Sequence, residues 1–120
     1  MEVKRMTYGE ARLMNLIWEA EPVSSTKLTE ICLQKLGWKK STAYTMLKRL
    51  VEKGYAKNEK ALVTARVSRS EAQAEESNYV VENSFAGSLP GFLVSFLGGK
   101  TISEKEAEEI KRLIDAHREV

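Results

Sequence analysis

The sequence predicts a mainly α-helical protein in two regions, and three observations support that prediction. Apolar residues recur with helical spacing through most of the 120 residues, but over residues 55–68 they alternate as in strands. Residues 1–68 hold 13 Lys and Arg against 7 Asp and Glu, whereas residues 69–120 hold 6 against 10. These patterns predict a winged helix-turn-helix domain with a small two-stranded wing over residues 1–68, followed by a three-helix dimerisation domain over residues 69–120.

The first predicted helix begins just after Thr7, because Thr7 and Glu10 have the spacing of a capping box. It should end near Ala20, since Glu21 precedes Pro22 and a residue before proline avoids helical dihedral angles. One side of this helix should therefore face a core. The residues at core spacing are Ala11, Leu13, Met14, Leu16, Ile17 and Trp18.

A second helix is expected from residue 24 or 25 to Lys35. A serine at its start can cap the first turn, and Gly37 can end the helix in a left-handed conformation. The connection to the next helix is only a few residues long, which is typical of a helix-turn-helix. The inward residues of the second helix are Leu28, Ile31, Cys32 and Leu36.

The third predicted helix runs from residue 39 or 40 to Lys53 and has two chemically different faces. Its apolar face consists of Ala43, Met46, Leu47, Leu50 and Val51. Its polar face consists of Ser41, Thr42, Tyr44, Thr45, Lys48 and Arg49. Such side chains neutralise phosphates or reach base edges, which is the chemistry of a helix in the major groove of DNA. The alternative is an amphipathic surface helix with solvated charges.

The wing is predicted from two short strands, residues 55–59 and 62–68, that pair around Lys60-Ala61. No Asn-Gly or Asp-Gly stands at this turn, so the sequence leaves the strand register open. Cations of the wing would lie beside the DNA backbone and extend the polar face of the third helix. The cations added to the predicted DNA-binding set are Lys39, Lys40, Lys53, Lys57, Lys60 and Arg66.

The sequence predicts three helices in the acidic second region. They cover residues 69–85, residues 90–97 and the residues after a capping box at Ser103. These small helices carry more apolar surface than they can bury among themselves. We therefore expect a homodimer, with packing onto the first domain as the alternative. The predicted dimerisation residues are Tyr79, Leu89, Phe92, Leu93, Phe96, Leu97, Ile110, Leu113 and Ile114.

Other classes of protein have little support in the sequence. The lone Cys32 can build neither an intramolecular disulfide nor a cysteine-rich metal site, and residues 1–5 open no signal peptide. The longest apolar run, residues 89–97, is too short to span a membrane. We therefore expect a cytoplasmic protein without membrane insertion.

Catalysis is not expected either. His117 is the only histidine and stands among charged residues near the end of the last helix. The glutamates of residues 104–109 form a solvated face, and residues 98–101 end like a phosphate-binding loop but lack its first glycine. The sequence thus predicts no catalytic residue, no cofactor and no metal.

Several segments resemble the penicillinase repressor family of bacterial winged-helix repressors, which includes beta-lactamase, methicillin-resistance and copper-responsive regulators. The segments that carry the resemblance are residues 8–11, 17–18, 22–24, 41–50 and 53–54, with residues 87–99 and the closing helix similar to the family's dimerisation region. The resemblance implies a homodimeric, sequence-specific transcriptional repressor that occludes promoters at palindromic operators in double-stranded DNA. The alternative is a winged-helix adaptor that binds an acidic protein surface without specific DNA binding.

Departures from the family narrow these expectations. Copper-responsive members carry cysteines near the C-terminus, and this chain has only Cys32, so copper sensing is not expected. In antibiotic-responsive members a membrane sensor protease cuts an Asn-Phe bond, and the matching candidate site here reads Ser95-Phe96. A protease that requires asparagine should leave the chain intact. The regulated genes, the operator and the inducing signal are not specified by the sequence, and Tyr44 in the third helix argues against assuming the resistance regulators' operator.

Overall fold

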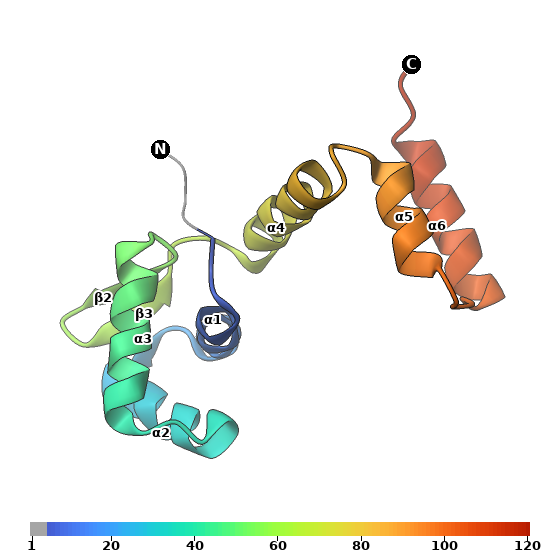
Figure 1. Ribbon diagram of the computed structural model, residues 1–120. Coiled ribbons are helices and arrows are strands. Elements are labelled where there is room, and N and C mark those ends of the chain that lie inside the picture. Colours follow the sequence, from blue (N-terminus) through green and yellow to red (C-terminus); the bar gives the residue numbers. More distant parts are fainter. Residues whose placement is uncertain (1–4) are drawn as a thin grey trace. The chain divides into compact units, whose positions relative to one another are not determined.

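The computed structural model describes residues 5–120, and in this range it contains six helices and three short strands (Figure 1). The chain divides into two compact units, Met1–Asn78 and Tyr79–Val120. The division falls inside helix α4 (Arg69–Ser84), ten residues beyond the boundary that the sequence predicts. The predicted boundary at residue 68 divides a DNA-binding domain from a dimerisation domain, and it stays a prediction.

Helix α1 (Tyr8–Ala20) confirms the predicted capping box. The Thr7 hydroxyl accepts a hydrogen bond from the Glu10 amide at 3.2 Å, and the Glu10 carboxylate accepts one from the Thr7 amide at 2.7 Å. The helix ends before Glu21, whose ψ of 143° is extended as expected for a residue that precedes proline.

Helices α2 (Ser25–Leu36) and α3 (Lys40–Glu52) follow within one or two residues of the predicted bounds. The Ser24 hydroxyl caps α2 by accepting from the Lys27 amide at 3.0 Å, and Gly37 ends it with a φ of 70°. Three residues separate α2 from α3, and α1, α2 and α3 pack on one another (Figure 1). The predicted helix-turn-helix is therefore present.

The sheet has one more strand than the sequence predicts. Strands β2 (Ala56–Glu59) and β3 (Leu62–Ala65) form the predicted antiparallel hairpin, and β1 (Val23–Ser24) pairs with the other edge of β3. The turn residues Lys60 and Ala61 have φ values of 51° and 63°, the positive values that a two-residue hairpin turn uses. With the three helices, this hairpin makes the unit a winged helix.

Strand β3 is also shorter than predicted, because it ends at Ala65 and not at Ser68. Just beyond it, the Trp18 indole donates a hydrogen bond to the Val67 carbonyl at 2.9 Å. The Val67 carbonyl is thus bonded to α1 and not to a neighbouring strand. Trp18 itself, predicted for the core, is only half-buried in this position.

One hydrophobic core holds the first unit together. It confirms most of the predicted inward residues of the first three helices, with Ile31 and Leu36 at its edge. Val51 is an exception, because it is 37% exposed at the last turn of α3. The largest fully buried apolar side chains are those of Leu13, Met14, Ile17, Leu28, Cys32, Leu50 and Val63.

The second unit contains the end of α4 together with α5 (Leu89–Leu97) and α6 (Glu104–Ala116). Capping serines begin both helices: Ser88 accepts from the Gly91 amide at 2.9 Å and Ser103 from the Glu106 amide at 3.0 Å. Neither α5 nor α6 has a fully buried side chain. Their apolar surface is therefore largely open in the single chain.

Among residues 5–120, no helix by itself is long and apolar enough to cross a membrane. Only α4 and α5 taken together, as a bent pair, have the length and composition for it.

Candidate nucleic-acid interface

The two faces of α3 differ as the sequence predicts. Ala43, Leu47 and Leu50 are at most 3% exposed and pack toward α1 and α2. The opposite face is open to solvent along its length. Its exposed members are Ser41, Thr42, Thr45, Lys48 and Arg49.

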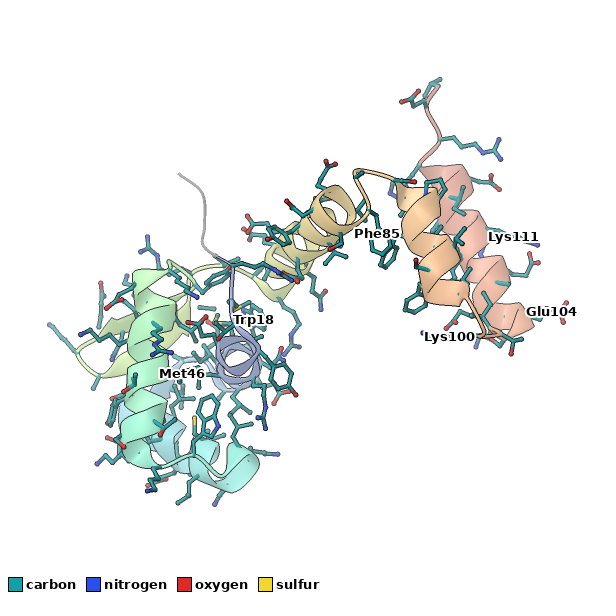
Figure 2. The ribbon with its side chains drawn as sticks, in the orientation of Figure 1. Trp18, Met46, Phe85, Lys100, Glu104 and Lys111 are labelled. Atoms are coloured by element: carbon teal, nitrogen blue, oxygen red, sulfur yellow. The ribbon has the colours of Figure 1, made fainter. Side chains whose placement is uncertain are left out.

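The Met46 side chain of α3 lies against Gly9 of α1. A Cβ atom at Gly9 would lie 2.9 Å from the Met46 Cε atom, the far end of a flexible side chain, so a larger residue would have to displace the Met46 side chain. Met46 points from α3 toward α1 in Figure 2 and fills the space above the glycine. Gly9 therefore leaves room for the end of the Met46 side chain against α1.

The exposed face of α3 contains a shallow depression lined by Ser41, Thr42, Thr45, Met46 and Arg49. The Thr45 hydroxyl donates to the Ser41 carbonyl at 3.0 Å, which leaves its oxygen free to accept. The Arg49 guanidinium lies 3.8 Å from the Met46 sulfur and stays exposed. Hydroxyl groups and a guanidinium thus surround a surface that a flat base edge or a phosphate could approach.

Tyr44 lies apart from this depression, although the sequence analysis placed it with the other polar residues of α3. Its hydroxyl is hydrogen-bonded to Ser25 and Thr26 at the start of α2, and these bonds, with the charge of Lys40, lower the pKa of Tyr44. The Lys40 ammonium lies 6.0 Å from the centre of the ring. Tyr44 therefore ties α3 to α2 at the edge of the exposed face.

The cations predicted around α3 lie at its start and on the wing. Lys39 and Lys40 begin α3 and are exposed, and Lys60 is exposed at the tip of the hairpin. Lys57 is exposed but paired with Glu59 at 3.1 Å, and Arg66 is exposed just after β3. The start of α3 and the wing are thus both positively charged.

Lys53 differs from the other predicted cations, because its ammonium group forms contacts inside the unit. The Nζ atom donates to the carboxylate of Glu10 and, at 3.0 Å, to the carbonyl of Arg5. The Glu10 carboxylate is only 1% exposed, so its charge depends on Lys53. An ammonium bonded to this carboxylate is less available to a phosphate than an exposed lysine, and a contact of Lys53 with DNA stays a prediction.

The sequence analysis missed a second role of Glu10, which is to pair with Lys53 at the end of α3. Burial by itself would raise its pKa, but hydrogen bonds from Lys53 and Thr7 outweigh burial and hold the pKa of Glu10 below its usual value. The capping-box spacing pointed to Glu10 as a helix-start residue. Nothing in the spacing indicated that a lysine 43 residues away would pair with it.

The predicted dimerisation residues lie in the second unit and form no closed core of their own. Phe92 and Leu93 are half-buried. Phe85, labelled in Figure 2, meets the edge of Phe92 at 5.3 Å between ring centres, and Phe92 stacks on Phe96 at 6.0 Å. The exposed members of the predicted set are Tyr79, Leu89, Phe96, Leu97, Ile110, Leu113 and Ile114, and Val94 and Ile102 join them.

The candidate proteolytic site lies in this same surface. Ser95 and Phe96 are both exposed on α5, and the Lys100 ammonium lies 4.3 Å from the centre of the Phe96 ring (Figure 2). Within residues 5–120, no group of three or more His, Cys, Asp or Glu side chains is placed to hold a metal ion.

Comparisons with known proteins match the chain over almost its whole length. A family model described as penicillinase repressor matches residues 6–116. The penicillinase repressor of Bacillus licheniformis is 21% identical over 121 residues, which cover 98% of this chain and 94% of that protein. The methicillin resistance regulatory protein MecI of Staphylococcus aureus is 22% identical over 111 residues, which cover 89% of this chain and 90% of that protein.

A solved structure resembles part of the chain. It is the solution structure of the monomeric form of Bacillus licheniformis BlaI in complex with the blaP half-operator, with a TM-score of 0.50 and 22% identity. The match covers 58% of this chain and 90% of the BlaI chain, and it agrees with the winged-helix fold. Because the family model spans both structural units, the chain belongs to the penicillinase repressor family.

Proposed function

We propose that this protein is a homodimeric, sequence-specific DNA-binding transcriptional repressor that occludes promoters at palindromic operators in the bacterial cytoplasm. The observation that carries the proposal is the exposed face of α3, where hydroxyls and the Arg49 guanidinium line the depression that includes Thr42 and Thr45. Family membership supports it, as does the fold likeness to a BlaI structure that contains half-operator DNA.

In this proposal α3 enters the major groove. Thr42, Thr45 and Arg49 face base edges, because hydroxyls and a guanidinium can read the donor and acceptor pattern there. Lys39, Lys40 and Lys48 neutralise phosphates beside the groove. Lys60 and Arg66 of the wing reach the neighbouring backbone, and Tyr44 holds α3 against α2.

A second copy of the chain covers the exposed apolar surface of the second unit. Leu89, Phe96, Leu113 and Ile114 are each more than 50% exposed, and symmetric association of two copies removes such surfaces from water. A dimer also engages two half-sites at once, which raises affinity for a palindrome far above that for one half-site.

Relief of repression is proposed to differ from that of the antibiotic-responsive relatives. A membrane sensor protease is the candidate partner, and the exposed bond between Ser95 and Phe96 is the candidate site. A pocket that hydrogen-bonds an asparagine side chain would lose those bonds at Ser95.

Selection of binding sequences from random double-stranded DNA tests the proposed function directly. We expect the full chain to enrich an inverted repeat, and an Arg49→Ala variant to lose discrimination at one position in each half-site. A matched Lys105→Ala variant, altered on exposed α6, should enrich the same repeat. Enrichment of no sequence at all would contradict the proposal and favour the adaptor that binds an acidic protein surface.

A further inference from the structure

Arg5 connects the segment before α1 to helix α4. Its guanidinium forms a two-pronged contact with the Glu76 carboxylate: Nε donates to Oε2 at 3.0 Å, and Nη2 donates to Oε1. A fork of two parallel hydrogen bonds fixes the relative orientation of the two groups as well as their distance. Arg5 and Glu76 are both about half-exposed, so the pair can be altered without opening the core.

The backbone of Arg5 takes part in a second contact. Its carbonyl accepts a hydrogen bond from the Lys53 ammonium at 3.0 Å, and the same ammonium binds the buried carboxylate of Glu10. Arg5 thus connects Lys53, at the end of α3, to Glu76 in the middle of α4. Helix α1 joins the same set of contacts, because Lys53 also binds Glu10. All of these residues belong to the first structural unit.

Near its start, α4 is attached to this unit by Arg69 and Ala72. The Arg69 guanidinium lies 5.3 Å from the centre of the Trp18 ring and 3.4 Å from the Asn15 carbonyl, and Ala72 is 7% exposed. Glu76 lies one helical turn beyond Ala72. A helix held along two turns has a defined direction, whereas a helix held only at its first turn can swing.

We propose that Arg5 and Glu76 are positioning residues for operator recognition: their pair fixes the direction in which α4 leaves the winged-helix unit and thereby sets the half-site spacing that the dimer accepts. The inference rests on the proposed function, because spacing matters only to a protein that binds two half-sites. A dimer selects one spacing only when its two recognition helices are held at a fixed separation.

Charge reversal tests the pair with the full chain. The variants are Arg5→Glu, Glu76→Arg and the double swap Arg5→Glu with Glu76→Arg, and the matched control is Glu75→Arg, the exposed neighbouring residue on the same helix. Each is assayed on operators whose half-sites are separated by spacers of varied length, and on a single half-site. The half-site assay measures the affinity of the DNA contacts alone, because a single half-site has no spacer.

We expect each single reversal to reduce the preference for the best spacing by about twofold to fivefold, the range for a half-exposed ion pair. The double swap should restore the preference, and Glu75→Arg should leave it unchanged. Half-site affinity should be the same for Glu76→Arg and Glu75→Arg, which carry equal charge. An unchanged spacing preference in both single variants, or no recovery in the double swap, would overturn the inference.

A measurement without DNA separates failure of this inference from failure of the proposed function. Backbone amides over residues 73–78 should exchange with solvent about twofold to fivefold faster in either single variant, and at the original rate in the double swap. Equal exchange in all variants would refute the role of the pair in holding α4. If amide exchange changes as expected in the variants but the unmodified chain binds no DNA specifically, the result would instead refute the proposed function and the operator role with it.

Discussion

Single residues contribute to how helix α3 is held, and the pair of Glu10 and Lys53 does so from inside the fold. The Glu10 carboxylate is 1% exposed and the Lys53 side chain 20% exposed. Among residues 5–120, no donor reaches Glu10 Oε2, so the carboxylate relies on Lys53 and Thr7. Removing one partner of such a pair leaves a buried charge without compensation.

Lys53→Ala should therefore lower the free energy of unfolding by about 2–3 kcal/mol, somewhat less than for a fully buried pair because Lys53 is partly exposed. Denaturant unfolding at one fixed protein concentration measures this loss. The exposed Lys48→Ala is the control and should change stability by less than about 0.5 kcal/mol. Equal stability of the two variants would show that Lys53 has no structural role.

The same pair predicts a pH dependence. Because the pKa of Glu10 is lowered in the folded chain, its contribution is complete above the unfolded-state pKa and is lost as the pH falls through the folded-state value. The destabilisation caused by Glu10→Gln should thus be constant from pH 7 to about pH 5 and shrink below about pH 4. Denaturant midpoints of both proteins across this range provide the measurement. A difference that grows on acidification would mean that the folded-state pKa is raised.

Ser95 carries the third prediction at this scale. Because a pocket built for asparagine loses hydrogen bonds at serine, a resistance-type sensor protease should leave the unmodified chain intact and should cut the Ser95→Asn variant. Immunoblots of induced cells that express each form give the readout. Fragments ending at Ser95 from the unmodified protein would contradict the prediction.

At the scale of elements, local signals located every helix but not every strand. The caps at Thr7, Ser24 and Ser103 and the glycine at Gly37 act within a few residues, so sequence spacing alone defines those ends. Strand β1 is only two residues long and exists because Val23 pairs with Val63, forty residues away. Pairing at that distance leaves no periodic signal in the sequence.

In the candidate site too, features within one helix could be predicted from the sequence, whereas contacts between helices could not. Helical spacing identified the exposed face of α3, because a face depends only on residues of one helix. It could not show that Tyr44 bonds to the start of α2 or that Lys53 pairs with Glu10, since both depend on how helices are placed. Val51 was misassigned for the same reason, because spacing does not reveal where the covering helices end.

Helix α5 carries the prediction about assembly. Phe96 is 51% exposed and stacks on Phe92, so Phe96→Asp would place a charge in the proposed interface while leaving the first unit untouched. A charge in an apolar interface costs several kcal/mol, so the variant should sediment as a monomer. Thr101→Asp, at an exposed loop position, should sediment as a dimer like the unmodified chain. A dimeric Phe96→Asp variant would contradict the proposed interface.

For the whole molecule, charge and exposure are divided between the two units. The exposed cations of α3 and the wing suit a polyanion, and the exposed apolar side chains of α5 and α6 suit a second copy of the chain. Helix α4 begins in one unit and ends in the other, so it connects the unit that carries the proposed DNA-binding surface to the unit that carries the proposed dimer surface.

The salt dependence of operator affinity tests the central proposal most directly. If each subunit makes about 3–5 phosphate contacts, the logarithm of affinity of the dimer should fall against the logarithm of salt concentration with a slope of roughly −5 to −9. Fluorescence anisotropy with the chain's own promoter, over a series of salt concentrations, measures that slope. We predict a slope in this range together with weaker binding to scrambled DNA; a slope near zero, or equal affinity for both DNAs, would contradict a sequence-specific repressor.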